Sequence, residues 1–67
     1  MSPVEFQAVT NRVLHEFLEM PGLRLTTCQA ARFWGLEPAV CEQVIESLVQ
    51  SGFLRRTAGG MVTRSDT

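Results

Sequence analysis

Glycine and proline divide this chain into short segments, and they limit its possible folds more than any other sequence feature. Pro21-Gly22, Gly35, Gly52 and Gly59-Gly60 each end or interrupt a run of apolar residues. Glycine adopts the left-handed backbone that ends helices and forms tight turns, whereas proline ends both helices and central strands. Since these positions lie at most about twenty residues apart, the sequence predicts several short elements joined by tight turns.

Three segments show the apolar spacing of an amphipathic helix, at intervals of three and four residues. Two of them begin with a capping pattern, Ser2 with Glu5 and Thr26 with Gln29, in which the first side chain accepts a hydrogen bond from the third helical amide. The third begins at Pro38, whose fixed φ suits the first position of a helix. The predicted helices are residues 3–20, 27–34 and 38–51.

The remaining segments predict a small β structure. Residues 23–25 alternate as a short edge strand, and residues 53–64 alternate around a glycine pair as a β-hairpin. A chain of 67 residues, of which 45% are hydrophobic and 19% charged, suffices for one globular domain and is too short for two. The expected fold is therefore mainly α with a small β-hairpin, a single α+β domain over residues 1–67.

The apolar faces of the helices predict which side chains form the core. Phe33 and Trp34 both fall in the helical spacing of residues 27–34, and we interpret both as core residues rather than as platforms for nucleic-acid bases. Cys28 and Cys41 lie in apolar-periodic segments without metal-ligand spacing, so they are expected to be buried thiols. The other predicted core residues are Phe6, Val9, Val13, Phe17, Leu25, Ala30, Val44, Ile45, Leu48 and Leu54.

The order helix, short strand, helix, glycine turn, helix, hairpin resembles the winged helix-turn-helix superfamily of small bacterial-type DNA-binding and regulatory domains, over residues 5–64. Ala31 is small enough for two helices to approach, and Gly35 supplies a left-handed residue for the turn between them. Residues 48–54 are similar to the passage from recognition helix to wing in that family. The apolar residues that would seal the angle between the two helices are Leu36, Cys41 and Val44.

The resemblance implies a contact with double-stranded DNA through the hairpin, as a wing, and through the outer face of residues 38–51. The chain carries six basic residues, all of them Arg, against seven acidic ones, so its net charge of −1 excludes a broad basic footprint. Any DNA contact must be local, and each candidate also has a simpler interpretation as a solvated surface side chain. The candidates are Arg55, Arg56 and Arg64 for phosphates and Gln43 and Gln50 for base edges.

The same helix also supports a different class of function. Glu42 and Glu46 lie one turn apart on its outer face, and no basic residue four positions away compensates their charge. Carboxylates near phosphates oppose association with DNA. With Ala39 and Glu37 beside them, they predict, as the alternative, a protein-interaction domain that docks a basic partner and does not contact DNA.

No motif supports an enzyme. His15 is the only histidine and has neither a second histidine nor clustered carboxylates at ligand spacing, so no catalytic residue, metal or cofactor is expected. No run approaches the roughly 18 apolar residues of a membrane helix, and the start of the chain lacks the pattern of a signal peptide. A cytoplasmic location without membrane contact is therefore expected.

Leu14 and Leu18 widen the apolar stripe of residues 3–20 beyond what a surface helix usually shows. A chain of this length gains only a few kcal/mol from a single core, and association is a common way to add apolar contact. A two-fold interface would use the same flank of both copies. The sequence therefore predicts a homodimer interface at Leu14 and Leu18.

Overall fold

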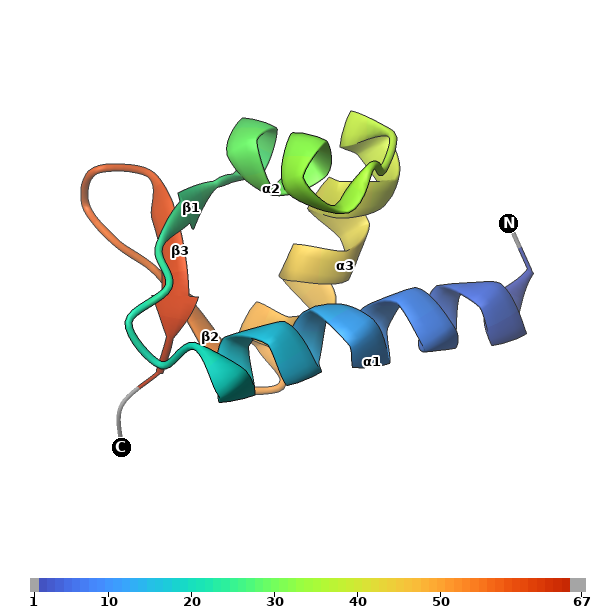
Figure 1. Ribbon diagram of the computed structural model, residues 1–67, viewed down its shortest axis with the longest axis horizontal. Coiled ribbons are helices and arrows are strands. Elements are labelled where there is room, and N and C mark those ends of the chain that lie inside the picture. The colour runs from blue at the N-terminus through green and yellow to red at the C-terminus, as the bar shows by residue number, and fades with distance from the viewer. Residues whose placement is uncertain (1, 66–67) are drawn as a thin grey trace.

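The computed structural model describes residues 2–65, which form three helices and three short antiparallel strands (Figure 1). Residue 1 and residues 66–67 of the predicted domain lie outside this range. The expectation of a mainly helical α+β fold is confirmed. In chain order the elements are α1 (Pro3–Glu19), β1 (Leu25–Thr26), α2 (Thr27–Trp34), α3 (Pro38–Gln50), β2 (Leu54–Arg56) and β3 (Met61–Arg64).

The helices start where the capping patterns predict. The Ser2 hydroxyl accepts a hydrogen bond from the Glu5 amide at 3.2 Å. At α2, the Thr26 hydroxyl accepts from the Gln29 amide at 3.1 Å, and the Gln29 side chain accepts from the Thr26 amide at 3.0 Å. Each cap satisfies an amide that the first helical turn leaves without an intrahelical partner. Local sequence therefore fixes the beginnings of α1 and α2.

Two of the helices end just before a glycine with a positive φ. Gly35 follows α2 with a φ of +64°, and Gly52 follows α3 with a φ of +85°. The Leu36 amide donates to the Ala31 carbonyl at 2.8 Å and closes the turn between α2 and α3. Both α1 and α3 end one residue earlier than predicted, since their last predicted residues serve as C-caps.

The strands form one antiparallel sheet in the order β1-β3-β2. β2 and β3 are the predicted hairpin, in whose turn Gly60 has a φ of +80°. The Thr57 amide donates to the Met61 carbonyl at 2.8 Å and closes this turn. In the register of the sheet, Leu25 pairs with Val62.

The predicted short strand is present, but it lies at Leu25–Thr26 and not at residues 23–25. The Leu23 amide donates to the Met20 carbonyl at 2.9 Å, so Leu23 still belongs to the turn after α1. Pairing begins only where the chain reaches β3, whose position is set by the distant hairpin. The alternation of apolar and polar residues over 23–25 does not show which of these residues will pair with β3.

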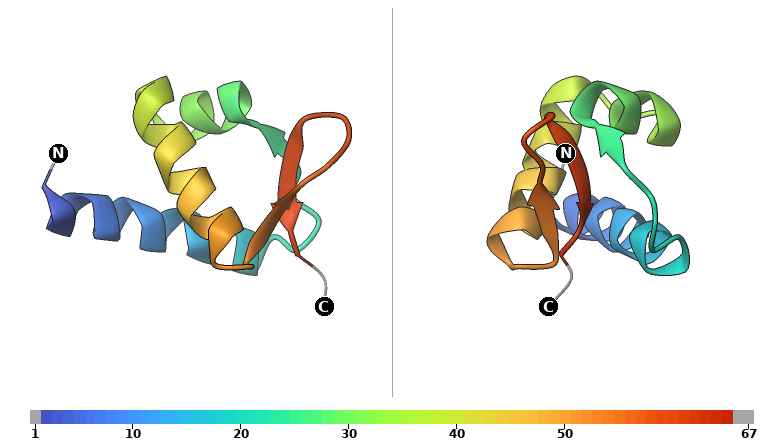
Figure 2. Two further views of the ribbon diagram at one scale, coloured as in Figure 1. Left: turned by 180° about the vertical axis from the view of Figure 1, so that it is seen from behind. Right: turned by 90° about the vertical axis from the view of Figure 1, so that its left-hand side faces the viewer.

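The core fills the space between α1 on one side of the molecule and α2 on the other, with α3 connecting them and the sheet at one end (Figures 1 and 2). Phe17 of α1 meets Trp34 of α2 there, with ring centroids 5.9 Å apart. Three further predicted core residues, Phe6, Val9 and Leu25, are half-buried and pack against the cluster. The buried apolar residues are Val13, Phe17, Ala30, Ala31, Trp34, Cys41, Val44, Ile45, Leu48, Leu54 and Val62.

Two predicted core residues are exposed, and those predictions were wrong. Phe33 is 55% exposed, and Cys28 also lies at the surface. The short helix α2 presents Ala30, Ala31 and Trp34 to the core. At about 100° of rotation per residue, Phe33 and Cys28 then fall on its two outer flanks. The apolar residues do recur at helical spacing, but this eight-residue helix buries only the side that carries Ala30, Ala31 and Trp34.

Cys41, in contrast, is buried, and this makes stability sensitive to alkaline pH. Burial, with smaller effects of Glu42 and Cys28, raises the pKa of the Cys41 thiol above its ordinary value of 9.0. Above that pH the unfolded thiol loses its proton while the folded thiol keeps it, so the unfolded state binds fewer protons. We expect the free energy of unfolding to fall from about pH 9 upward, as measured by urea denaturation.

The control for this prediction is Cys41→Val, which keeps an apolar side chain of similar size and has no titrating group. Cys28 is present in both proteins, so the two differ only at position 41. The variant should lose less stability than the parent above about pH 9. Equal losses in the two proteins would contradict a raised pKa at Cys41.

Candidate functional site

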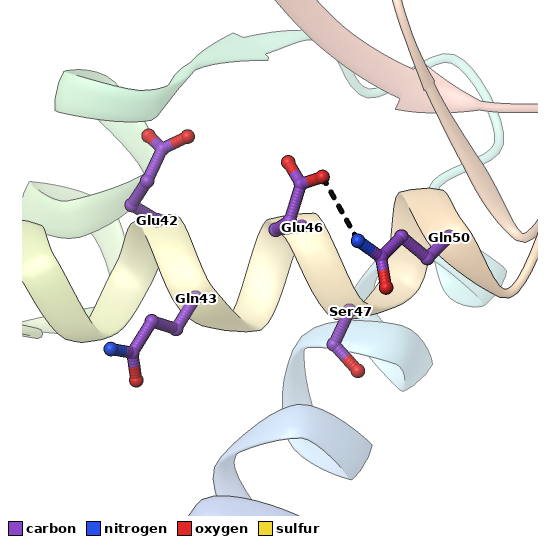
Figure 3. Close-up of a pocket in the computed structure, with 5 residues that line it drawn as sticks. All are labelled: Glu42, Gln43, Glu46, Ser47 and Gln50. Carbon is purple, nitrogen blue, oxygen red and sulfur yellow. Dashed lines mark hydrogen bonds between the residues drawn. The ribbon is translucent and has the colours of Figure 1, made fainter.

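The outer side of α3 carries the polar residues that the sequence predicts to bind DNA or a basic partner. The opposite side packs into the core, so these side chains face solvent. Figure 3 shows Glu42 and Glu46 pointing to one side of the helix and Gln43 and Ser47 to the other. Ala39 is also exposed, one turn nearer the helix start. We call the shallow depression in this face the α3 surface; it is lined by Glu42, Gln43, Glu46, Ser47 and Gln50.

Arg56 of β2 bridges the two carboxylates of the α3 surface. Its Nη2 lies 2.9 Å from Oε1 of Glu42 and 3.1 Å from Oε2 of Glu46. The chain turns back after α3, so β2 packs against the helix and brings Arg56 beside it. The two glutamates, which have no compensating charge along their own helix, therefore share a cation from the hairpin.

These pairs affect the charge of the surface more than the stability of the fold. The pKa of Arg56 is raised, and the hydrogen bond to Glu46 is the largest cause. Burial, the second largest effect, lowers the pKa, but the charge and hydrogen bond of Glu42 and the charge of Glu46 raise it further. The glutamate side chains remain 52% and 51% exposed, so water screens both pairs. Such exposed pairs contribute about 0–1 kcal/mol. Their main consequence is a fixed guanidinium between two half-exposed carboxylates.

Gln50 also takes part in this arrangement. Its Nε2 donates to Oε1 of Glu46 at 3.3 Å, as the dashed line in Figure 3 marks. One of the two glutamines predicted to read base edges thus has a donor occupied within α3. Gln43 points away from this pair, so it is the more available of the two amides.

The sheet separates the three hairpin arginines that sequence places together. Successive strand residues point to opposite faces, so Arg55 lies on the face away from Arg56 and α3. Arg55 is exposed, whereas Arg64 is half-buried and pairs across the ladder with Leu54. The hairpin is therefore not one basic patch: Arg56 pairs with Glu42 and Glu46, and Arg55 lies on the opposite face of the sheet. Arg64 shares the face of Arg56 but lies beside Leu54, at the other end of the ladder.

The flank of α1 proposed as a dimer interface is divided in the same way. Leu14 is half-buried and packs against the core, whereas Leu18 is 43% exposed. Met20 and Val4 on the same helix and its end are exposed as well, at 38% and 78%. Leu14 therefore packs within the single chain, whereas Leu18 remains exposed to solvent.

The described part of the chain also contains possible metal ligands and two free thiols. Within residues 2–65, no three His, Cys, Asp or Glu side chains lie close enough together to hold a metal ion. His15 is exposed on α1, and the two thiols are unbridged. None of the helices in this range is long and apolar enough to cross a lipid bilayer.

Sequence reasoning missed two features of the surface. The Arg56 bridges join residues 14 and 10 positions apart, which only the folding of the hairpin brings together. A second depression lies where α2, β1 and β3 meet, and it contains the exposed Phe33. A lone exposed aromatic has no sequence signature distinct from that of a core aromatic.

The α3 surface and the hairpin carry groups suited to binding. They offer amide groups, a bridged pair of carboxylates and arginines, which are groups that recognise a polar macromolecule by charge and hydrogen bonds. No protein-family model matches this chain, and neither a curated protein nor a solved structure matches it significantly.

Proposed function

We propose that this protein is a winged helix-turn-helix module that binds duplex DNA through the α3 surface and the β2–β3 hairpin. The order of the helices and strands supports the proposal, because a short helix, a tight turn and a second helix precede a hairpin. Residues 35–37 join α2 to α3, a length typical of helix-turn-helix units. In this proposal α3 is the recognition helix and β2–β3 is the wing.

The observation that carries the proposal is the pairing of Arg56 with Glu42 and Glu46. Two uncompensated carboxylates on a recognition helix would repel the phosphates on both sides of the groove. Arg56 lies between them and offsets part of their negative charge. The repulsion that the sequence alone predicts is thereby reduced, and Gln43 stays available for a base edge.

Each residue then has a distinct role. Arg55 and Arg64 contact phosphates, which position the module without reading sequence. Gln43 and, after release from Glu46, Gln50 reach base edges. Arg56 acts on the electrostatics of the helix rather than as a third phosphate contact.

The proposal predicts weak and salt-dependent binding to any duplex. With two phosphate contacts, the logarithm of affinity falls against the logarithm of salt concentration with a slope of about −2, since each contact contributes roughly 0.9. Arg55→Ala should weaken binding to all duplexes alike and reduce the slope to about −1. Fluorescence anisotropy of a labelled duplex between about 50 and 200 mM salt measures both.

The matched control is Arg12→Ala, which removes an exposed arginine of α1 outside the α3 surface and the hairpin. Its affinity and salt slope should equal those of the parent. A parent that binds no duplex at about 50 mM salt, or an Arg12→Ala variant with the same loss as Arg55→Ala, would remove the support for a wing contact.

The second candidate function is docking of a basic protein partner on Glu42, Glu46 and Ala39. The exposure of about half of each glutamate side chain favours it, because a partner's arginine or lysine can replace Arg56. The two candidate functions predict opposite effects of the same substitution on binding. Removing the two carboxylate charges weakens capture of a basic partner and strengthens capture of DNA.

The proposal includes a homodimer through α1. Leu18, being 43% exposed, supplies the contact, and Leu14 supports it from the core side. Sedimentation of the parent should show concentration-dependent association near 100 µM, roughly the range of weak dimers, and Leu18→Glu should abolish it. Phe33→Ala, which removes an exposed apolar side chain of α2, should leave the association unchanged. Monomeric parent and Leu18→Glu proteins of equal stability would contradict the interface.

A cytoplasmic location belongs to the same proposal. Cys28 and Cys41 are both free thiols, and unbridged cysteines suit a reducing compartment. Duplex DNA is accessible to a small module there in a bacterial-type cell.

A further inference from the structure

A second surface lies on a different part of the molecule from the α3 surface, where α2, β1 and the start of β3 meet (Figure 1). We call it the α2–β1 surface. The proposed DNA contact uses none of its residues, and its chemistry is different. It is lined by Arg24, Leu25, Gln29, Arg32, Phe33 and Met61.

Phe33 is held at this surface and is not a loose side chain. Its ring packs edge-on against Trp34, with centroids 5.4 Å apart and an interplanar angle of 71°. Trp34 is only 5% exposed, so the support beneath the ring belongs to the core, while Phe33 itself is 55% exposed. Fixed aromatic side chains with an open face are the residues that contribute most to protein interfaces. Leu25 and Met61, both half-buried, complete the apolar part of the surface.

The charged groups that line this surface are two arginines, which are hydrogen-bond donors only. Arg24 and Arg32 are exposed, and neither takes part in the ion pairs formed within residues 2–65. The oxygen of the Gln29 side chain accepts from the Thr26 amide at 3.0 Å, which leaves its Nε2 as the group able to bind a ligand. No carboxylate from residues 2–65 lines the depression. The surface therefore selects a ligand that carries negative charge and an apolar group together.

We propose that the α2–β1 surface docks an acidic peptide segment of a partner protein. One apolar side chain of the segment packs on Phe33, Leu25 and Met61, and neighbouring carboxylates pair with Arg24 and Arg32. Arginine forms two parallel hydrogen bonds with a carboxylate, so two such pairs fix the segment in one orientation. A single nucleic-acid strand fits less well, because bases stack on successive aromatic rings and this surface has one ring flanked by aliphatic chains.

The inference is independent of DNA binding. The α3 surface carries two glutamates bridged by Arg56, whereas the α2–β1 surface carries two arginines and no acidic side chain from residues 2–65. The two surfaces share no lining residue, so binding at each can be tested separately. A segment bound to the second surface would connect the module to an acidic partner while α3 remains open.

The test begins with a random dodecapeptide library displayed on phage and selected on the immobilised full chain. Enriched peptides should carry Asp or Glu beside a leucine, methionine or aromatic residue. One enriched peptide, synthesised with a fluorescent label, is then titrated by anisotropy. Arg32→Glu, Arg24→Glu and Phe33→Ala should each lower its affinity by at least about tenfold, the level expected of central interface residues.

Matched controls separate this site from general electrostatics and from the α3 surface. Arg12→Glu makes the same charge reversal at an exposed arginine of α1 and should leave peptide affinity unchanged. Arg24 lies outside the helices and strands, so Arg24→Glu keeps the test valid if a helix variant loses structure. Glu42→Gln should leave peptide binding intact, and Arg24→Glu should leave duplex binding intact. Each assay can therefore succeed or fail without the other.

Three results would overturn the inference. The first is a selection without enrichment of acidic residues, and the second is an equal loss of affinity in Arg32→Glu and Arg12→Glu. The third is a labelled single-stranded oligonucleotide that binds the parent more tightly than any selected peptide and depends on Phe33, which would assign the surface to nucleic acid.

Discussion

Replacing both Glu42 and Glu46 by Gln should strengthen binding to duplex DNA by at least about tenfold at low salt. Glutamine keeps the length and hydrogen-bonding capacity of each side chain but removes a negative charge that lies near the phosphates in the proposed complex. A unit charge at contact distance is worth about 1 kcal/mol in water, and the change removes two of them. It also releases Arg56, which both carboxylates hold in the free protein. Anisotropy of a labelled duplex at about 50 mM salt measures the gain.

The single variant Arg56→Gln provides the reverse experiment. It leaves two carboxylates without their shared cation, so duplex binding should weaken although Arg56 itself touches no phosphate in the proposal. In the background of the two glutamines, Arg56 is free to reach DNA, and its removal then measures a direct contact. A double-mutant cycle separates these two effects. Weaker DNA binding by the glutamine variant, together with weaker capture of a basic protein, would favour the docking function instead.

Local features of the fold could be predicted because they depend on neighbours in sequence. The capping box of Thr26 and Gln29 and the left-handed glycines Gly35 and Gly52 each involve residues at most a few positions apart. Their energetics are settled within one helical turn, so a pattern of residue types is sufficient. The hairpin is likewise predictable, since Gly60 supplies the positive φ its turn requires.

Nonlocal features of the fold could not be predicted in this way. The bridge from Arg56 to Glu42 and Glu46 depends on how β2 packs on α3, and its effect reverses the simple interpretation of an uncompensated acidic helix. The exposure of Phe33 depends on which side of α2 the rest of the chain covers. The Arg56 bridges and the exposure of Phe33 both concern surface side chains that could bind a ligand. Both depend on how the helices and strands are placed relative to one another. Sequence pattern therefore predicted the elements better than it predicted the candidate site.

Phe17→Ala should remove a large part of the free energy of unfolding at about 25 °C. Phe17 is 1% exposed and packs against Trp34 at 5.9 Å, so truncation leaves a cavity between α1 and α2. Truncating a buried Phe costs about 3–5 kcal/mol, and a domain of this size has roughly 3–10 kcal/mol of total stability. Far-UV circular dichroism and urea denaturation measure the loss.

Phe33→Ala is the matched control, because the same substitution removes a ring that also packs against Trp34, with ring centroids 5.4 Å apart. Phe33 is 55% exposed, so its removal opens no enclosed cavity and should cost about 1 kcal/mol. Trp34→Phe should also be milder than Phe17→Ala, since the lost indole N–H is buried and has no hydrogen-bond partner within residues 2–65. Equal destabilisation by Phe17→Ala and Phe33→Ala would mean that both rings belong to the core. In that case Phe33 could not be an exposed anchor for a partner.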